Sequence, residues 1–164
     1  MNEEVDEQNN LKVDHTLYMK MAIQEAMKAM DEGEVPVGTV IVHNNKVIAK
    51  GYNRVETTKD PTAHSEIIAI GAASDYLDNW RLEGCTLYST LEPCPMCAGA
   101  ILNARVSRVV YGAKDKRLGA CGSACRLLDV GLLNRETEVI SSVMEEDCAI
   151  LLKAFFMEIR QRKK

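Results

Sequence analysis

The residues best suited to chemistry in this chain are one histidine and two cysteines of the kind that bind zinc. His64 supplies an imidazole nitrogen, and Cys94 and Cys97 supply two thiolates. Three protein ligands leave the fourth tetrahedral position of zinc open for water, which is the arrangement of a catalytic zinc site. Glu66 would place a carboxylate beside that water. We therefore predict one Zn²⁺ per subunit, held by His64, Cys94 and Cys97, with Glu66 as the catalytic residue.

Other interpretations of these residues are weaker. The pair Cys94 and Cys97 alone is also typical of a redox motif or of half a structural zinc site. A structural site needs a fourth protein ligand, and a redox pair needs neither His64 nor Glu66. The full order, His-x-Glu followed by Pro-Cys-x-x-Cys, is the signature of zinc-dependent deaminases. Zinc peptide hydrolysis is the competing class, but the chain has no His-Glu-x-x-His motif.

That signature favours hydrolytic deamination of an amidine carbon in a heteroaromatic ring. Zinc makes a bound water far easier to deprotonate than bulk water. Glu66 is not needed as a ligand, so it is free to take the proton of the water and to hand it to a ring nitrogen. The amine then leaves as ammonia.

Strands and helices that alternate along the chain would position these residues. A helix from about Thr62 to Leu77 places His64 and Glu66 in its first turn. Thr86 to Leu91 is predicted as a strand, and Cys94 caps a second helix that runs to about Ala104, with Pro95 at its first position. Two helix N-termini then meet at one point, where their positive dipole ends favour thiolates.

The remaining elements complete a mixed, five-stranded sheet covered on both faces. A helix from Asp14 to Gly33 presents Leu17, Met21, Met27 and Met30 as a core-facing stripe, and we expect His15 and His43 to be exposed to solvent. The other predicted elements are strands 37–43 and 46–51 joined by a hairpin at Asn44-Asn45, a strand over 108–111, an irregular loop over 112–124, a short helix over 125–132, a strand over 138–143 and a helix over 145–162.

Composition is that of one globular domain. The chain has 164 residues, of which 46% are hydrophobic and 27% charged, so it can bury a good core. We expect residues 1–13 to be frayed and residues 14–164 to form a single domain. Apolar runs are too short to span a membrane, and the acidic start lacks the pattern of a signal peptide. With six cysteines and no export signal, we expect a cytoplasmic protein.

Binding to nucleic acid would depend on local clusters of cations, because the formal net charge is −4. Two such clusters stand out: the run Lys114-Asp115-Lys116-Arg117 and the basic end of the chain, residues 160–164. Cys121 and Cys125 are too few for a second metal site, and we expect small, partly buried thiols there.

Much of the chain resembles the bacterial tRNA adenosine deaminases, which convert adenosine to inosine at the wobble position of the anticodon. The matching stretches are Glu34-Val35-Pro36-Val37-Gly38, Gly51-Tyr52-Asn53-Arg54, Asp60-Pro61-Thr62-Ala63-His64-Ser65-Glu66, residues 90–100, Tyr111-Gly112-Ala113-Lys114-Asp115, Gly119-Ala120, Gly122-Ser123 and Glu146-Asp147-Cys148-Ala149 leading into Phe155-Phe156. The resemblance implies a three-layer α/β/α fold of the cytidine deaminase type, a homodimer and the anticodon stem-loop of tRNA as partner.

The resemblance also implies roles for residues outside the zinc motif. Asn53 would contact the flipped base, and Asp115 and the helix with Phe155 and Phe156 would lie on the RNA-binding side. Lys116 and Arg117 are our candidates for phosphate contacts. Two departures from the family are Ser65, where alanine is usual, and Met157-Glu158-Ile159, where more basic residues are expected.

Two alternatives remain at this point. A free-base deaminase such as guanine deaminase shares the Asp-Pro-Thr-Ala-His and Glu-Pro-Cys-Pro-Met-Cys segments, but it has no evident use for the cations at 114–117. A catalytically inactive RNA-binding or scaffold subunit is the other, and the intact Glu66 argues against it.

Overall fold

The computed structural model describes residues 13–164, so the predicted fraying of residues 1–13 lies, apart from Val13, outside the described residues. The helices are α2 (His15–Asp31), α3 (Val55–Thr58), α4 (Ser65–Leu77), α5 (Pro95–Asn103), the 3₁₀ turn η1 (Leu132–Asn134) and α6 (Glu145–Arg162). The strands are β1 (Gly38–His43), β2 (Lys46–Tyr52), β3 (Cys85–Leu91), β4 (Arg108–Ala113) and β5 (Glu138–Ile140).

The five strands form one mixed sheet in the order β2-β1-β3-β4-β5. The pairs β1–β2 and β1–β3 are antiparallel, whereas β3–β4 and β4–β5 are parallel. Asn44 and Asn45 adopt positive φ values at the β1–β2 turn, as the hairpin prediction requires. The predicted mixed, five-stranded α/β sheet is confirmed.

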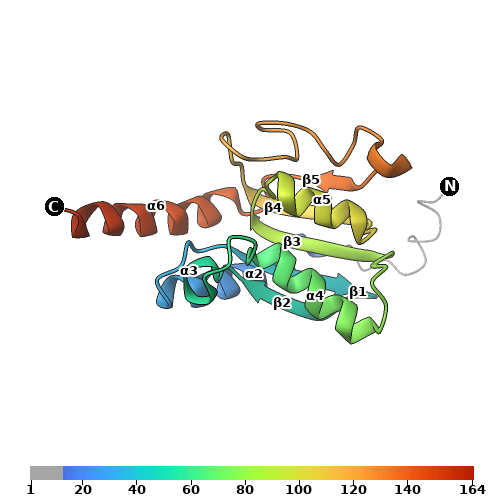
Figure 1. The fold of residues 1–164 in the computed structure, drawn as a ribbon, viewed down its shortest axis with the longest axis horizontal. Coiled ribbons are helices and arrows are strands. Elements are labelled where there is room, and N and C mark those ends of the chain that lie inside the picture. The colour runs from blue at the N-terminus through green and yellow to red at the C-terminus, as the bar shows by residue number, and fades with distance from the viewer. Residues whose placement is uncertain (1–12) are drawn as a thin grey trace.

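Alternating side chains divide the core into two layers, one on each face of the sheet (Figure 1). Ile41, Leu87 and Val109 pack with residues of α4 and α5. Their sequence neighbours Val40, Tyr88 and Val110 point to the other face, where α2 and α6 lie. Helices therefore cover both faces, and the three-layer α/β/α architecture is confirmed.

Helix α2 buries only part of the stripe that we predicted: Met21 packs against the core, but two other members do not. Leu17 and Met27 are exposed, and the face that packs on the sheet is made of Met19, Ala22, Glu25, Ala26 and Ala29. The reason is close approach: a Cβ atom at Gly38 would lie only 2.1 Å from the carbonyl oxygen of Ala22. Only small side chains fit between backbones at that distance. His15 is half-buried, and its Nδ1 lies 2.9 Å from the Tyr88 hydroxyl, so the expectation that it is solvated was wrong.

The segment over residues 125–132 forms no helix, contrary to the prediction. Its backbone instead bonds the preceding loop: the Cys125 amide donates to the Gly119 carbonyl, and the Leu127 amide donates to the Ala120 carbonyl. These contacts fix a non-helical path, and a 3₁₀ turn follows at Leu132–Asn134. The short helix α3 lies between the second predicted strand and the helix that we predicted from about Thr62, and β5 ends at Ile140 rather than at residue 143.

In the part of the chain that the structure describes, no helix combines the length and the apolar character needed to cross a membrane.

Candidate active site

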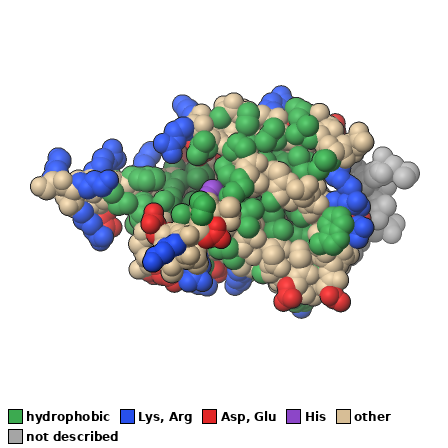
Figure 2. Space-filling view, in the orientation of Figure 1, with side chains coloured by type: hydrophobic (Ala, Val, Ile, Leu, Met, Phe, Trp, Pro, Cys, Tyr) green, Lys and Arg blue, Asp and Glu red, His purple; other side chains and the backbone are tan. Residues whose placement is uncertain are grey.

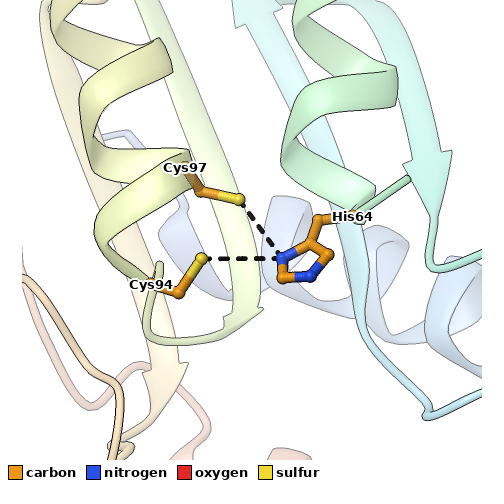
Figure 3. A group of neighbouring side chains, drawn as sticks. All are labelled: His64, Cys94 and Cys97. Carbon is orange, nitrogen blue, oxygen red and sulfur yellow. Dashed lines mark hydrogen bonds between the residues drawn. The ribbon is translucent and has the colours of Figure 1, made fainter. Parts of the chain in front are cut away.

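His64, Cys94 and Cys97 converge at one point between two helix N-termini (Figure 3). The Nδ1 atom of His64 lies 3.6 Å from the sulfur of Cys94 and 3.5 Å from that of Cys97. Zinc bonds of about 2.1 Å to nitrogen and 2.3 Å to sulfur at tetrahedral angles would separate such atoms by about 3.6 Å. The three side chains therefore fit a tetrahedral zinc ion, and they form the one such group found among residues 13–164.

Secondary structure explains why the three ligands meet. His64 and Cys94 are the N-cap residues of α4 and α5, and both have extended backbones. Helix α4 starts at Ser65 rather than at Thr62, so His64 precedes the first turn that we predicted for it. Pro95 opens α5, and Cys97 lies in its first turn. Free amide groups and positive dipole ends thus surround the site, and both favour thiolates.

The cysteine pair is electrostatically asymmetric. The hydrogen bond from Cys97 lowers the pKa of Cys94 to about 4. The same bond, together with burial, raises the pKa of Cys97. A hydrogen bond to Cys94 raises the pKa of the His64 imidazole. Two sulfurs and a ring nitrogen thus share protons at short range, and a divalent cation would satisfy all three groups at once.

Glu66 lies beside His64 in the cavity wall, and it is only 3% exposed. Burial raises the pKa of its carboxyl group, although the positive charge of His64 works in the opposite direction. The Ser65 hydroxyl lies 3.1 Å from its Oε2 atom, and the Ser89 hydroxyl lies 3.3 Å from its Oε1 atom. A buried carboxyl group with few fixed partners beside a candidate metal is typical of a general acid–base residue.

A cavity of about 710 Å³ opens onto His64, Glu66 and Cys94. Figure 2 shows this side of the molecule as a hollow between the body and the projecting helix α6, with largely hydrophobic walls and with Lys and Arg side chains around it. The volume is in the range of ordinary small-ligand sites. The remaining walls come from the β2–α3 segment (Asn53, Val55, Glu56), from residues 114–118 and from Leu152 and Phe156 of α6.

Two buried glutamates hold the irregular walls of the cavity. Glu34 is 1% exposed, and it accepts from the amides of Glu56 and Thr57, so it fixes the start of α3. Glu92 is 2% exposed, and it accepts from the amides of Cys121 and Ser123 and from the Ser123 hydroxyl. These roles were missed, although both residues lie in the stretches that carry the family resemblance.

Position 119 requires glycine, because the Glu92 carboxylate lies against the backbone there. A Cβ atom at Gly119 would lie 1.9 Å from the Oε2 atom of Glu92 and 2.4 Å from the Asp115 carbonyl oxygen. Any larger residue would push the loop off its carboxylate anchor. A lone charged residue between Leu91 and Pro93, followed by a glycine-rich loop, was the available sequence signal.

Most of the other predicted site residues do line the cavity. Asn53 is buried, and its amide nitrogen donates to the Val35 carbonyl at 3.3 Å. The Asp115 carboxylate accepts from the amides of Arg117 and Leu118, both at 3.0 Å, and so shapes the turn that carries the cations. Lys116, Arg117 and Phe156 are exposed along the rim.

Phe155 does not join this group. It is 6% exposed and lines a second, smaller hollow with Met30 and Gly33 of the α2 end. Its ring meets Phe156 edge to face, with centroids 5.4 Å apart. Phe155 therefore anchors α6, and Phe156 is the member of the pair that faces the cavity. Cys121 is half-buried and Cys125 is exposed, and neither joins the metal-ligand group.

Comparisons with known proteins agree on a deaminase. The model of the MafB19-like deaminase family matches residues 13–160. A tRNA-specific adenosine deaminase of Bacillus subtilis (strain 168) is 51% identical over 148 residues, which is 90% of this chain and 92% of that protein. A solved structure from biochemical and structural studies of A-to-I editing by tRNA:A34 deaminases is 41% identical, has a TM-score of 0.81, and is matched over 84% of this chain and 100% of its own.

A guanine deaminase from Bacillus subtilis is also similar, but over a smaller part. It is 42% identical with a TM-score of 0.59, and the match covers 62% of this chain and 66% of that one.

Proposed function

We infer the function from a family assignment: this chain belongs to the MafB19-like deaminases and, among them, to the tRNA-specific adenosine deaminases. It is an enzyme that deaminates adenosine to inosine at the wobble position of tRNA. The observation that carries the chemistry is the buried Glu66 in the wall of the cavity that His64 and Cys94 also line.

We propose that His64, Cys94 and Cys97 bind one Zn²⁺ per subunit. The fit of their ligand atoms to a tetrahedron supports this assignment. When bound, zinc would activate a water molecule for attack on the adenine ring. Glu66 takes a proton from that water and delivers it to the ring nitrogen next to the attacked carbon. The second proton of the water passes to the exocyclic amine, which leaves that carbon as ammonia, so one water is consumed for each ammonia released.

The cavity walls would hold an adenosine that has been extruded from the anticodon loop. Asn53 has an amide within the wall, where it can hydrogen-bond a base edge. Phe156 offers an aromatic face at the rim, on which an unpaired base can stack. Unpaired loop bases cost least to extrude.

Phosphate contacts would come from the cations on the turn after β4. Lys114, Lys116 and Arg117 are exposed beside the cavity, and Asp115 binds the backbone of this turn rather than opposing a phosphate. This arrangement supports local attraction of RNA in a chain whose net charge is negative.

We further propose a cytoplasmic homodimer, as the family resemblance implies. Sedimentation at micromolar concentration should give twice the chain mass of 18.2 kDa. A monomer at all concentrations that support activity would contradict the dimer.

The second candidate function is free-base deamination, which the likeness to a guanine deaminase favours. One experiment separates the two. Purified protein is incubated with an adenosine-containing anticodon stem-loop, with guanine and with cytosine, and ammonia release is measured. We expect release from the stem-loop alone. Ammonia release from guanine but not from the stem-loop would show that guanine, and not tRNA, is the substrate.

A further inference from the structure

Three buried hydroxyl groups gather beside the Glu66 carboxylate. Thr39 of β1, Ser65 of α4 and Ser89 of β3 are all 0% exposed. Thr39 and Ser89 are directly opposite each other in the β1–β3 pairing, and Ser65 begins the helix that crosses above them. The proposed chemistry uses none of these hydroxyls, so their presence in an otherwise apolar layer needs a reason.

The distances and the chemistry of the partners decide which hydroxyl donates in each hydrogen bond. Ser65 Oγ lies 3.1 Å from Glu66 Oε2 and 2.8 Å from Thr39 Oγ1. An ionised carboxylate only accepts, so Ser65 commits its single proton to Glu66. Thr39 must then donate to Ser65. The result is a chain in which Thr39 orients Ser65, and Ser65 holds one oxygen of Glu66.

The second oxygen of Glu66 is held less firmly. Ser89 Oγ lies 2.8 Å from the Leu91 carbonyl oxygen but 3.3 Å from Glu66 Oε1. A carbonyl oxygen also only accepts, and the shorter contact takes the single Ser89 proton. Oε1 therefore does not receive the Ser89 proton, and the two carboxylate oxygens of Glu66 differ in their hydroxyl partners.

Packing alone does not explain the Ser65 hydroxyl. A Cβ atom at Gly51 would lie 2.6 Å from the Ser65 carbonyl oxygen, so α4 passes close to β2 and needs small residues here. Alanine would meet that need equally well. The hydrogen bonds of this hydroxyl go to the Thr39 side chain and to the Glu66 carboxylate rather than to an amide of the helix start.

We propose that Ser65, oriented by Thr39, is a positioning residue for Glu66. It fixes Oε2 and so leaves Oε1 as the oxygen that takes and returns the proton. The inference rests on the proposed function in that it assigns Glu66 the proton transfer. It also gives a consequence to Ser65, the position where the chain departs from the alanine usual in the resembling family.

The test compares Ser65→Ala with Ser74→Ala, its matched control. Ser74 lies on the same helix, and its hydroxyl bonds the Ile70 carbonyl away from the cavity. Loss of a hydrogen bond to a charged group should lower kcat about tenfold in Ser65→Ala, with KM and metal content unchanged. Ser74→Ala should match wild type. An unchanged kcat in Ser65→Ala, or a change in KM alone, would overturn the proposal.

Thr39→Val tests the chain of donors, since valine keeps the shape and removes the hydroxyl. We expect a smaller fall in kcat, of about threefold, and no additional fall when it is combined with Ser65→Ala, because both act through one bond. Falls that multiply in the double variant would show that Thr39 does not act through Ser65.

A structural measurement separates this inference from the substrate assignment. Crystal structures of wild type and Ser65→Ala should differ in the orientation of the Glu66 carboxylate, whatever the substrate is. An unmoved carboxylate would overturn the positioning role. If wild type releases ammonia from guanine instead of RNA, the kcat ratios are measured on guanine, and only the proposed substrate fails.

Discussion

Two walls of the cavity are built by different means. The helix wall consists of His64, Ser65, Glu66 and Cys94, which lie at the N-termini of two helices packed on the sheet. The loop wall consists of residues 114–118, which belong to no regular element. It continues into a loop whose backbone is bound by the carboxylate of Glu92. Rigid elements thus carry the proposed chemistry, and an anchored loop carries the proposed contacts with RNA.

This difference indicates that the two walls have different roles, which steady-state kinetics can distinguish. Proton transfer tolerates little displacement, because reacting atoms must stay within hydrogen-bond range. Phosphate contacts by long cationic side chains tolerate more. Changes in the helix wall should therefore act on kcat, and changes in the loop wall should act on KM and on RNA affinity.

Cys97→Ala should have the largest effect, because it removes one of the three proposed metal ligands. We expect metal at far below one equivalent per chain by elemental analysis, and no inosine above background. Cys125→Ala is the matched control, because Cys125 is exposed and outside the cluster. Full metal content in Cys97→Ala would show that this sulfur is not a ligand.

Glu66→Ala should keep the metal and the fold but lose turnover. General acid–base groups contribute about 10²–10⁴-fold, and kcat should fall within that range while KM for the stem-loop stays near the wild-type value. Glu136→Gln, an exposed carboxylate outside the cavity lining, is the control. Near-wild-type turnover in Glu66→Ala would mean that another group moves the protons.

The helix wall was also the part that the sequence predicted best. The spacing within each half of the motif is local, from His64 to Glu66 and from Cys94 to Cys97, and Pro95 marks the helix start that brings the two thiols to the site. Short runs rich in apolar and β-branched residues, bounded by turn residues, indicated the strands. Short-range patterns were sufficient in both cases.

The loop wall could not be predicted in the same way, because its structure depends on contacts distant in sequence. Glu92 binds amides 29 and 31 residues further along the chain. In place of the helix that we predicted over 125–132, the Cys125 and Leu127 amides bond carbonyl groups of the preceding loop. The core-facing stripe that we predicted for α2 was partly wrong for a related reason. Only the approach to Gly38 in the folded state shows why alanines, and not Leu17 or Met27, face the sheet.

Glu92→Gln should loosen the loop wall and leave the helix wall in place. The amide is a poorer acceptor than a carboxylate, and its NH₂ group would face backbone donors. We expect the free energy of unfolding to fall by about 1–3 kcal/mol. KM for the stem-loop should rise severalfold with little change in kcat, as measured by urea unfolding and steady-state kinetics. A fall in kcat with KM unchanged would show that the two walls are not independent.

The smallest effect should come from the double charge reversal Lys116→Glu with Arg117→Glu. Both side chains are exposed, so fold and metal content should be preserved. Each phosphate contact adds about 0.7 to the salt slope of binding to single-stranded RNA. Loss of two contacts should therefore weaken affinity and flatten the slope by about 1.4. The double variant Lys20→Glu with Lys50→Glu, on α2 and on the edge strand β2, controls for the same change in net charge. Equal weakening in this control would reduce the cations at 116 and 117 to a general charge effect, and the loop wall would lose its assigned role.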